Sequence, residues 1–166
     1  NKGFRHGRLN RTMFDDGLTG ELHFENLELP EEALIGEVGQ GFEIALTSIN
    51  WTRTRRGGMC SAWSKLLIDK SLDRLKSRVV GGKPLGRNQG LQWMISDMYL
   101  DWFSSRSSSL SCLREIEKFG PWWDTKRPAE QIRLFAMMKI INDEAFYRVA
   151  DKALQLHGAA GIMKDT

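Results

Sequence analysis

The 166 residues carry a formal net charge of +3, with 41% hydrophobic and 27% charged residues, which excludes a disordered chain and a general basic surface for nucleic acid. No apolar run reaches the roughly 18 residues of a membrane-spanning helix, and the opening NKGFRHGRLNRT lacks the apolar core of a signal peptide. Cys60 and Cys112 form neither a CxxC pair nor a disulfide framework, so we expect a reducing compartment.

Residues 1–38 are predicted to form short strands and turns. The stretch FDDGLTG combines an Asp-Gly pair with a second glycine, which is typical of a turn. The following ELHFENLELP alternates apolar and polar positions like a half-buried strand, with a slip in register at Glu25–Asn26 and an end at Pro30. Because one or two strands do not make a stable sheet, we expect this segment to be the end of a sheet domain whose other strands precede residue 1.

The spacing of apolar residues becomes helical near residue 39. It predicts a short helix over 41–56, a break at Gly57–Gly58, and a second helical stretch to about residue 78. After the GGKP turn, a helix is predicted from 91 to about 119, and a last one ends at Gly158. The apolar positions expected to face the core are Phe42, Ala45, Ile49, Met59, Ala62, Trp63, Leu66 and Leu67, then Leu91, Met94, Ile95, Met98, Trp102 and Phe103, and finally Leu134, Met138, Ile141, Ala145, Val149, Ala153 and Leu156.

These elements predict a mainly α fold. Residues 39–166 should form an antiparallel bundle of long helices, of the four-helix type, preceded by a short β remnant of an upstream sheet domain. The fourth helix would be either 41–56 or a helix beyond Thr166, so we expect the bundle domain to be incomplete. The run SSRSSSLS at 104–111 lies inside a helical pattern and indicates exposed serines or close helix contact.

Three places can carry chemistry, and each also has a simpler interpretation. Arg78 ends one helix and Gln89 lies in the first turn of the next, which suits helix termini, although an arginine there can also bind a phosphate. The HGAAG stretch at 157–161 is expected to be a helix C-cap with a left-handed glycine, whose backbone N–H groups can also bind phosphate or ribose. Asn50 and Arg53 share a helix face, and taken alone this pair favours a solvated surface.

Other reactive side chains point to no site. Cys60 has basic neighbours that would lower a thiol pKa, but the favoured interpretation is a small buried residue. His6, His23 and His157 are scattered and lack the spacing of a zinc site.

Four motifs, read in order, resemble the acyl-CoA dehydrogenase family. FENLELPEEALIGEVGQGFEIAL at 24–46 is similar to the end of that family's middle β-domain, "F-x-x-V-x-V-P … G-x-x-G-x-G-F". Asn50 and Arg53 occupy the positions of its Asp-x-x-Arg. RVVGGKPLGRNQGLQWMISDM at 78–98 is similar to "R-x-x-F-G-K-P-L-x-x-x-Q-x-x-x-x-x-x-A-D-M". ALQLHGAAGIMKD at 153–165 is similar to "A-x-Q-x-x-G-G-x-G".

The resemblance implies part of an FAD enzyme that performs α,β-dehydrogenation of an acyl-CoA thioester and passes electrons to an electron-transfer flavoprotein. It implies a homotetramer, a dimer of dimers, with FAD at a subunit interface, in a bacterial cytoplasm or a mitochondrial matrix. By position, Asn50 and Arg53 match a pair that binds the CoA portion of the substrate. The residues that match FAD contacts are Arg78, Gln89, Gln155, Leu156, His157, Gly158 and Ala159.

The chain departs from the family pattern at three positions. Gly81 replaces an aromatic residue, Ala159 replaces the second glycine of the last motif, and Asn50 replaces an aspartate. The general-base glutamate of most members is expected beyond Thr166. Thr52 occupies the alternative position of that glutamate, and its hydroxyl is no general base, so no catalytic residue is assigned and the chain by itself is expected to be inactive.

Two alternatives stay open at this point. One is an acyl-CoA oxidase or a flavin monooxygenase relative of the same fold. The other is a non-catalytic helical scaffold, in which Gly81 and Ala159 mark a lost FAD site.

Overall fold

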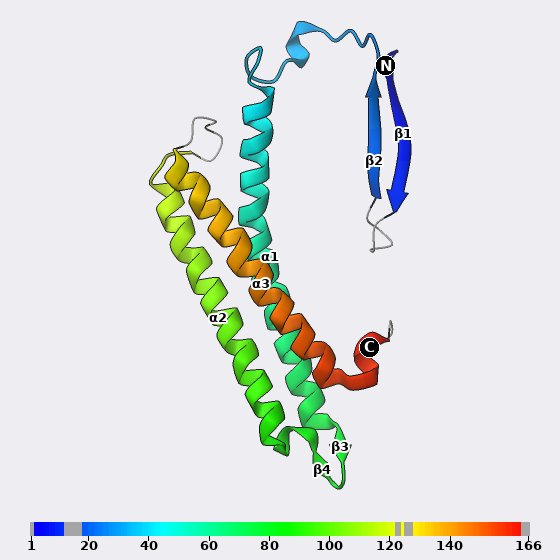
Figure 1. Cartoon of the computed structure of the whole chain (residues 1–166), viewed down its shortest axis with the longest axis vertical. Helices are drawn as coiled ribbons and strands as arrows, with labels where there is room; N and C mark the ends of the chain where they lie inside the picture. Colours follow the sequence, from blue (N-terminus) through cyan, green and yellow to red (C-terminus); the bar gives the residue numbers. More distant parts are fainter. Residues whose placement is uncertain (1, 12–17, 122–123, 125–127, 164–166) are drawn as a thin grey trace. The chain divides into compact units, whose positions relative to one another are not determined.

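The computed structural model describes residues 2–11, 18–121, 124 and 128–163 (Figure 1). The chain divides into two compact units, Asn1–Gly41 and Phe42–Thr166. Each unit is one continuous stretch of the sequence.

The first unit is a two-stranded antiparallel ribbon. Strand β1, Phe4–Arg11, pairs with β2, Leu18–Phe24, from Phe4 opposite Phe24 to Arg11 opposite Leu18, with an irregularity between His6 and Leu9. Leu9, Leu22 and Phe24 are exposed, because the described residues of this unit supply no further strand to cover the ribbon. The predicted strand is wrong beyond Phe24, because Asn26 adopts a positive φ of 48° and turns the chain. The 3₁₀ turn η1, Glu31–Ala33, follows. Residues 14–17, which belong to the turn predicted from FDDGLTG, lie outside the described part of the chain.

The second unit begins with α1, Gly41–Ser77, a single helix of 37 residues. The predicted break at Gly57–Gly58 is therefore wrong. The expected apolar face is also wrong over this helix, because Phe42, Ile49 and Met59 are exposed. Small and polar side chains form most of the face that is buried instead: Thr47, Asn50, Thr54, Gly57, Cys60, Ser64, Ile68, Ser71 and Leu75.

Close packing explains why a glycine lies in the middle of α1. A Cβ atom added at Gly57 would lie 3.1 Å from Nδ2 of Asn142 and 3.5 Å from Oγ of Ser109. The Asn142 amide nitrogen donates to Oγ of Ser109 at 2.6 Å and to the carbonyl of Met138 at 2.7 Å. The three long helices thus meet at a polar contact, and no hydrophobic period signals it.

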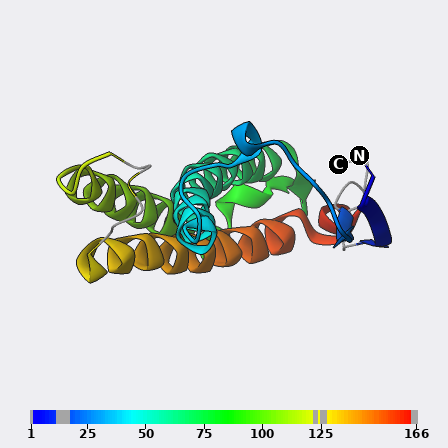
Figure 2. The same ribbon diagram turned by 90° about the horizontal axis from the view of Figure 1, so that it is seen from above.

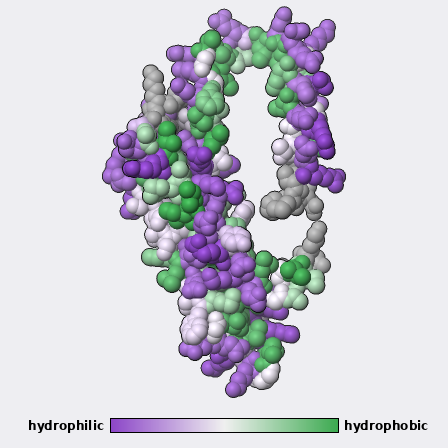
Figure 3. Space-filling view, viewed as in Figure 1, coloured by the Kyte–Doolittle hydropathy of each residue, from purple (hydrophilic) through white to green (hydrophobic). Residues whose placement is uncertain are grey.

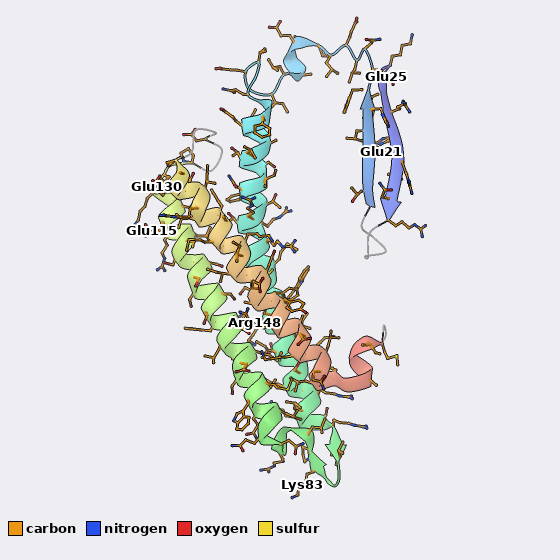
Figure 4. The ribbon with its side chains drawn as sticks, viewed as in Figure 1. Glu21, Glu25, Lys83, Glu115, Glu130 and Arg148 are labelled. Atoms are coloured by element: carbon orange, nitrogen blue, oxygen red, sulfur yellow. The ribbon has the colours of Figure 1, made fainter. Side chains whose placement is uncertain are left out.

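A small hairpin joins α1 to the next helix. Strand β3, Val79–Val80, pairs with β4, Lys83–Pro84, and the labelled Lys83 lies at this tip in Figure 4. The two linking residues, Gly81 and Gly82, have φ values of 59° and 79°. Two-residue hairpins need positive φ at these positions, so a local backbone requirement accounts for Gly81 where the resemblance expects an aromatic residue.

Two further helices complete the unit. After the 3₁₀ turn η2, Leu85–Arg87, helix α2 spans Gln89–Glu117 and packs on α3, Ala129–His157, which ends in the 3₁₀ turn η3, Gly158–Ile162 (Figures 1 and 2). The labelled Arg148 of α3 reaches Asp101 of α2 at 2.7 Å (Figure 4). Buried Ser105 and Ser109 confirm close helix contact within the serine run.

The core of the second unit forms two clusters. One contains Ile68, Leu75, Ile95, Met98, Val149, Ala153 and Leu156, and the other contains Cys112, Ile116, Phe135 and Met138. The expectation of a mainly α fold of long helices with a short β segment is confirmed. The described residues contain three long helices, because 41–56 is the first part of α1.

Candidate functional site

One end of the bundle gathers the residues that were predicted to contact a cofactor. The last turn of α1, the first turns of α2 and the last turn of α3 meet there, because Leu75, Ile95 and Leu156 belong to one core cluster. Figure 1 shows the β3–β4 hairpin beside this end. The fold therefore brings Arg78, Gln89 and the 155–159 segment to the same end of three helices.

Arg78 directly follows α1 and anchors the hairpin through its backbone. Its N–H donates to the carbonyl of Arg74 at 2.9 Å, and its own carbonyl accepts the N–H of Leu85 at 2.8 Å. The Arg78 side chain is exposed, and so is Gln89, the first residue of α2. Neither side chain makes a hydrogen bond or ion pair within the described ranges, so both retain their donors for a ligand.

The turn after α3 ends the helix where the sequence predicts, but its backbone differs from the prediction. Gly158 has φ 61° and ψ −141°, which is not the left-handed helical conformation of a common C-cap and approaches a region that only glycine adopts readily. Gly158 donates its N–H to the carbonyls of Gln155 and Leu154. Gln155 and Ala159 are exposed, whereas the side chain of Leu156 is buried in the core.

Two further residues shape this turn: Gly161, the last glycine of the motif in the sequence, and Arg74 of α1, which the sequence analysis did not single out. A Cβ atom added at Gly161 would lie 2.8 Å from the carbonyl oxygen of Leu154, so a glycine is required there. Arg74 Nη2 donates to the carbonyl of His157 at 3.4 Å, while its buried Nε has no hydrogen-bond partner. A positive charge at the carboxyl end of a helix also interacts favourably with the helix dipole, so Arg74 ties α1 to the end of α3.

A hollow of about 330 Å³ lies beside this turn. Lys70 of α1, His157 of α3 and Gly161 are among its lining residues, and the rest of the lining is apolar apart from backbone. His157 Nδ1 lies 2.9 Å from the carbonyl of Ala153, which orients the imidazole ring.

Asn50 and Arg53 form a second candidate site on α1. Asn50 is only 7% exposed, so the simpler interpretation of this pair as solvated surface is wrong. Arg53 Nη1 donates to Oδ1 of Asn50 at 3.0 Å, and the guanidinium is thereby held on the helix face. Asn50 remains an acceptor in the place of the expected aspartate, without its charge.

Asp143 of α3 lies next to this pair. Arg56 Nε donates to its Oδ1 at 2.8 Å, and Lys139 Nζ lies 3.0 Å from its Oδ2. Burial alone would raise the pKa of Asp143, but the hydrogen bonds from Arg56 and Lys139 outweigh burial and hold the pKa below its ordinary value. An ionised, doubly paired carboxylate is a poor general base, and Thr52 donates its hydroxyl to the carbonyl of Ser48.

Cys60 is buried, as the simpler interpretation predicted. Burial raises the pKa of its thiol, and the nearby Asp143 carboxylate raises it further. These two effects outweigh the lowering of the pKa by the neighbouring Arg56. Over the described part of the chain, no helix has the length and apolar character that crossing a membrane requires.

Comparison with known proteins gives a consistent result. The family model described as "Acyl-CoA dehydrogenase, C-terminal domain" matches residues 39–166. The chain is 32% identical over 165 residues to an acryloyl-CoA reductase (NADH) from Anaerotignum propionicum, covering 98% of this chain and 39% of the relative. It is 28% identical over 169 residues to an acyl-CoA dehydrogenase from Bacillus subtilis, covering 98% and 41%.

A solved structure shows the same fold. Butyryl-CoA dehydrogenase from Megasphaera elsdenii superposes with a TM-score of 0.82 at 23% identity, over 99% of this chain and 41% of that chain. The chain thus spans about two fifths of the length of the relatives it matches.

Proposed function

Because the chain belongs to the acyl-CoA dehydrogenase family, we propose that it forms part of an FAD-dependent enzyme that dehydrogenates an acyl-CoA thioester between its α- and β-carbons. The proposal extends to the transfer of the electrons to an electron-transfer flavoprotein. The observation that carries it is the convergence of exposed Arg78, Gln89 and the 155–159 backbone at one end of the bundle.

The donors at this end fit FAD. The Arg78 guanidinium suits a diphosphate, because it can donate two parallel hydrogen bonds to phosphate oxygens. Gln89 and Gln155 add exposed amides, and a Cβ atom added at Gly158 would meet nothing within 4 Å, so the turn is open at this residue. Leu156 would contribute only through its backbone. Bound FAD would supply hydride acceptance, a chemistry that protein side chains do not provide.

Asn50 and Arg53 would bind the CoA portion of the substrate. The hydrogen bond between them fixes the guanidinium before a ligand arrives, which reduces the entropy lost on binding. We assign no general base to this chain, because Thr52 has only a hydroxyl and Asp143 is held ionised by two cations. Residues 1–166 by themselves should therefore not turn over substrate.

A homotetramer, arranged as a dimer of dimers, is part of the proposal. Exposed apolar side chains support an assembly, and Figure 3 shows green apolar patches among the purple surface of the helices. The exposed apolar and aromatic side chains of this unit include Trp93, Leu100, Phe103 and Leu110 on α2 and Ile140, Tyr147 and Leu154 on α3. Two unpaired cysteines agree with the proposed location in a bacterial cytoplasm or a mitochondrial matrix.

Flavin spectroscopy of the full-length protein tests the function. The protein should carry the visible absorbance band of an oxidised flavin, and an acyl-CoA added without oxygen should bleach this band, because the flavin accepts the hydride. Reoxidation by an electron-transfer flavoprotein rather than by oxygen would separate a dehydrogenase from an oxidase. A flavin-free protein would instead support the non-catalytic scaffold.

A second candidate is the reverse reaction, reduction of an enoyl-CoA. The relative at 32% identity is named an acryloyl-CoA reductase (NADH), and the same site chemistry serves both directions. Mixing the protein with NADH and acryloyl-CoA distinguishes the two: NADH consumption favours the reductase, and its absence together with bleaching by a saturated acyl-CoA favours the dehydrogenase.

A further inference from the structure

A hollow of about 340 Å³ lies between α1 and α3, next to the Asn50–Arg53 pair. Its lining comes from one face of α1, with Ile49, Thr52, Arg53 and Arg56 at helical spacing, and from Lys139 and Asp143 one turn apart on α3. This volume is at the lower end of the range for sites that hold small ligands.

The charges that line this hollow do not balance. Three cations, Arg53, Arg56 and Lys139, face a single carboxylate, Asp143, so two positive charges remain uncompensated among its lining residues. Arg56 and Lys139 each use one oxygen of Asp143, at 2.8 and 3.0 Å. The carboxylate therefore holds the two cations side by side without exhausting their donors.

The cations are also positioned before any ligand binds. Arg56 uses its Nε on Asp143, which leaves its two terminal nitrogens without a partner among the described residues. Arg53 donates a hydrogen bond from one terminal nitrogen, Nη1, to Oδ1 of buried Asn50. Arg53 and Arg56 lie three residues apart on α1, so their remaining N–H groups lie on neighbouring positions of one helix face, where they can bind one oxyanion together.

We propose that this hollow, formed by Arg53, Arg56 and Lys139, binds an oxyanion of the thioester ligand. The anion is carried either by the phosphates of the nucleotide portion or by a free carboxylate at the end of the acyl group. Ile49 supplies an apolar wall for the carbon atoms next to this anion. The inference rests on the proposed function, and it adds Arg56 and Lys139 to the residues that choose the substrate.

Substitutions at the two added residues test the site. Arg56→Gln and Lys139→Gln each remove one charge, and both side chains are about half exposed or more, so the fold should survive. Arg55→Gln is the matched control, because it removes the same charge one residue away on exposed α1 surface outside the hollow. Circular dichroism of each variant verifies that the helices remain.

Calorimetric titration of the full-length protein with butyryl-CoA and glutaryl-CoA measures the effect. We expect each substitution in the hollow to weaken binding about five- to tenfold, as loss of one charge-assisted hydrogen bond does, and the control to change it less than about twofold. Weakening with both ligands identifies the nucleotide phosphates as the anion, whereas weakening with glutaryl-CoA alone identifies the acyl carboxylate. Both results support the site.

Two results would overturn the inference in different ways. If the unaltered protein binds both thioesters and the hollow variants bind them equally well, the inference is wrong and the proposed function stands. If the unaltered protein binds neither thioester, the proposed function fails and this inference fails with it.

Discussion

Gly57 and Gly58 are adjacent glycines in the middle of α1, and the structure predicts opposite effects when each becomes alanine. At Gly58 an added Cβ meets nothing within 4 Å, so Gly58→Ala should stabilise the protein by about 1 kcal/mol, the usual preference for alanine in a helix interior. At Gly57 the same Cβ lies 3.1 Å from Nδ2 of Asn142.

Asn142 has little freedom to move away. It is 1% exposed, and hydrogen bonds to Ser109 and Met138 fix its amide. Overpacking of this kind costs about 1–3 kcal/mol. Because the helix preference is the same at both glycines, it cancels when the variants are compared, and Gly57→Ala should be less stable than Gly58→Ala by about 1–3 kcal/mol.

Urea unfolding followed by circular dichroism measures this difference in the free energy of unfolding. It is obtained from the midpoint urea concentrations of the two variants, provided that both have the same dependence of free energy on urea concentration. Equal free energies of unfolding for the two variants would refute the close packing of α1 on Asn142. A larger loss for Gly58→Ala would refute the orientation of α1 altogether.

Two further predictions concern Arg74 and Asp143. Arg74→Met removes the hydrogen bond to His157, worth about 0.5–1.5 kcal/mol, so amide exchange at 158–162 should accelerate roughly three- to tenfold; unchanged exchange rates would exclude a role for Arg74 in holding this turn. Hydrogen bonds that outweigh burial lower the pKa of Asp143, so its stabilisation is present above the unfolded-state pKa of about 3.9 and is lost as the pH falls through the lower folded-state pKa. The destabilisation caused by Asp143→Asn should therefore shrink between about pH 4 and pH 2 in urea titrations, and a loss independent of pH would contradict the assigned ion pairs.

The helices of the second unit could be predicted where large apolar side chains form the buried face. On α3, Met138, Val149 and Leu156 follow the helical period and are buried, so this helix and its end at Gly158 were predictable. On α1 the same reasoning failed. Its buried face uses Asn50, Gly57 and other small or polar residues, which permit close approach but leave no hydrophobic period.

The candidate sites depend even more on tertiary structure. Motif order predicted Arg78, Gln89 and the 155–159 segment, but their common location follows from how three helix ends pack. The contact of Arg74 with His157 joins residues 83 positions apart in the sequence, so no local sequence pattern predicts it. Asp143 has one local and one distant partner: Lys139 lies one turn away on α3, whereas Arg56 comes from α1, 87 positions away in the sequence.

The central claim, that FAD binds at this end of the bundle, is tested most directly by the flavin affinity of Arg78→Gln. Arg87→Gln is the matched control, since Arg87 is an exposed arginine of the neighbouring turn η2. Fluorescence titration of the flavin-stripped, full-length protein with FAD should show affinity reduced about tenfold or more by Arg78→Gln and changed less than about twofold by Arg87→Gln. Equal FAD affinities for both variants and the unaltered protein would contradict the claim.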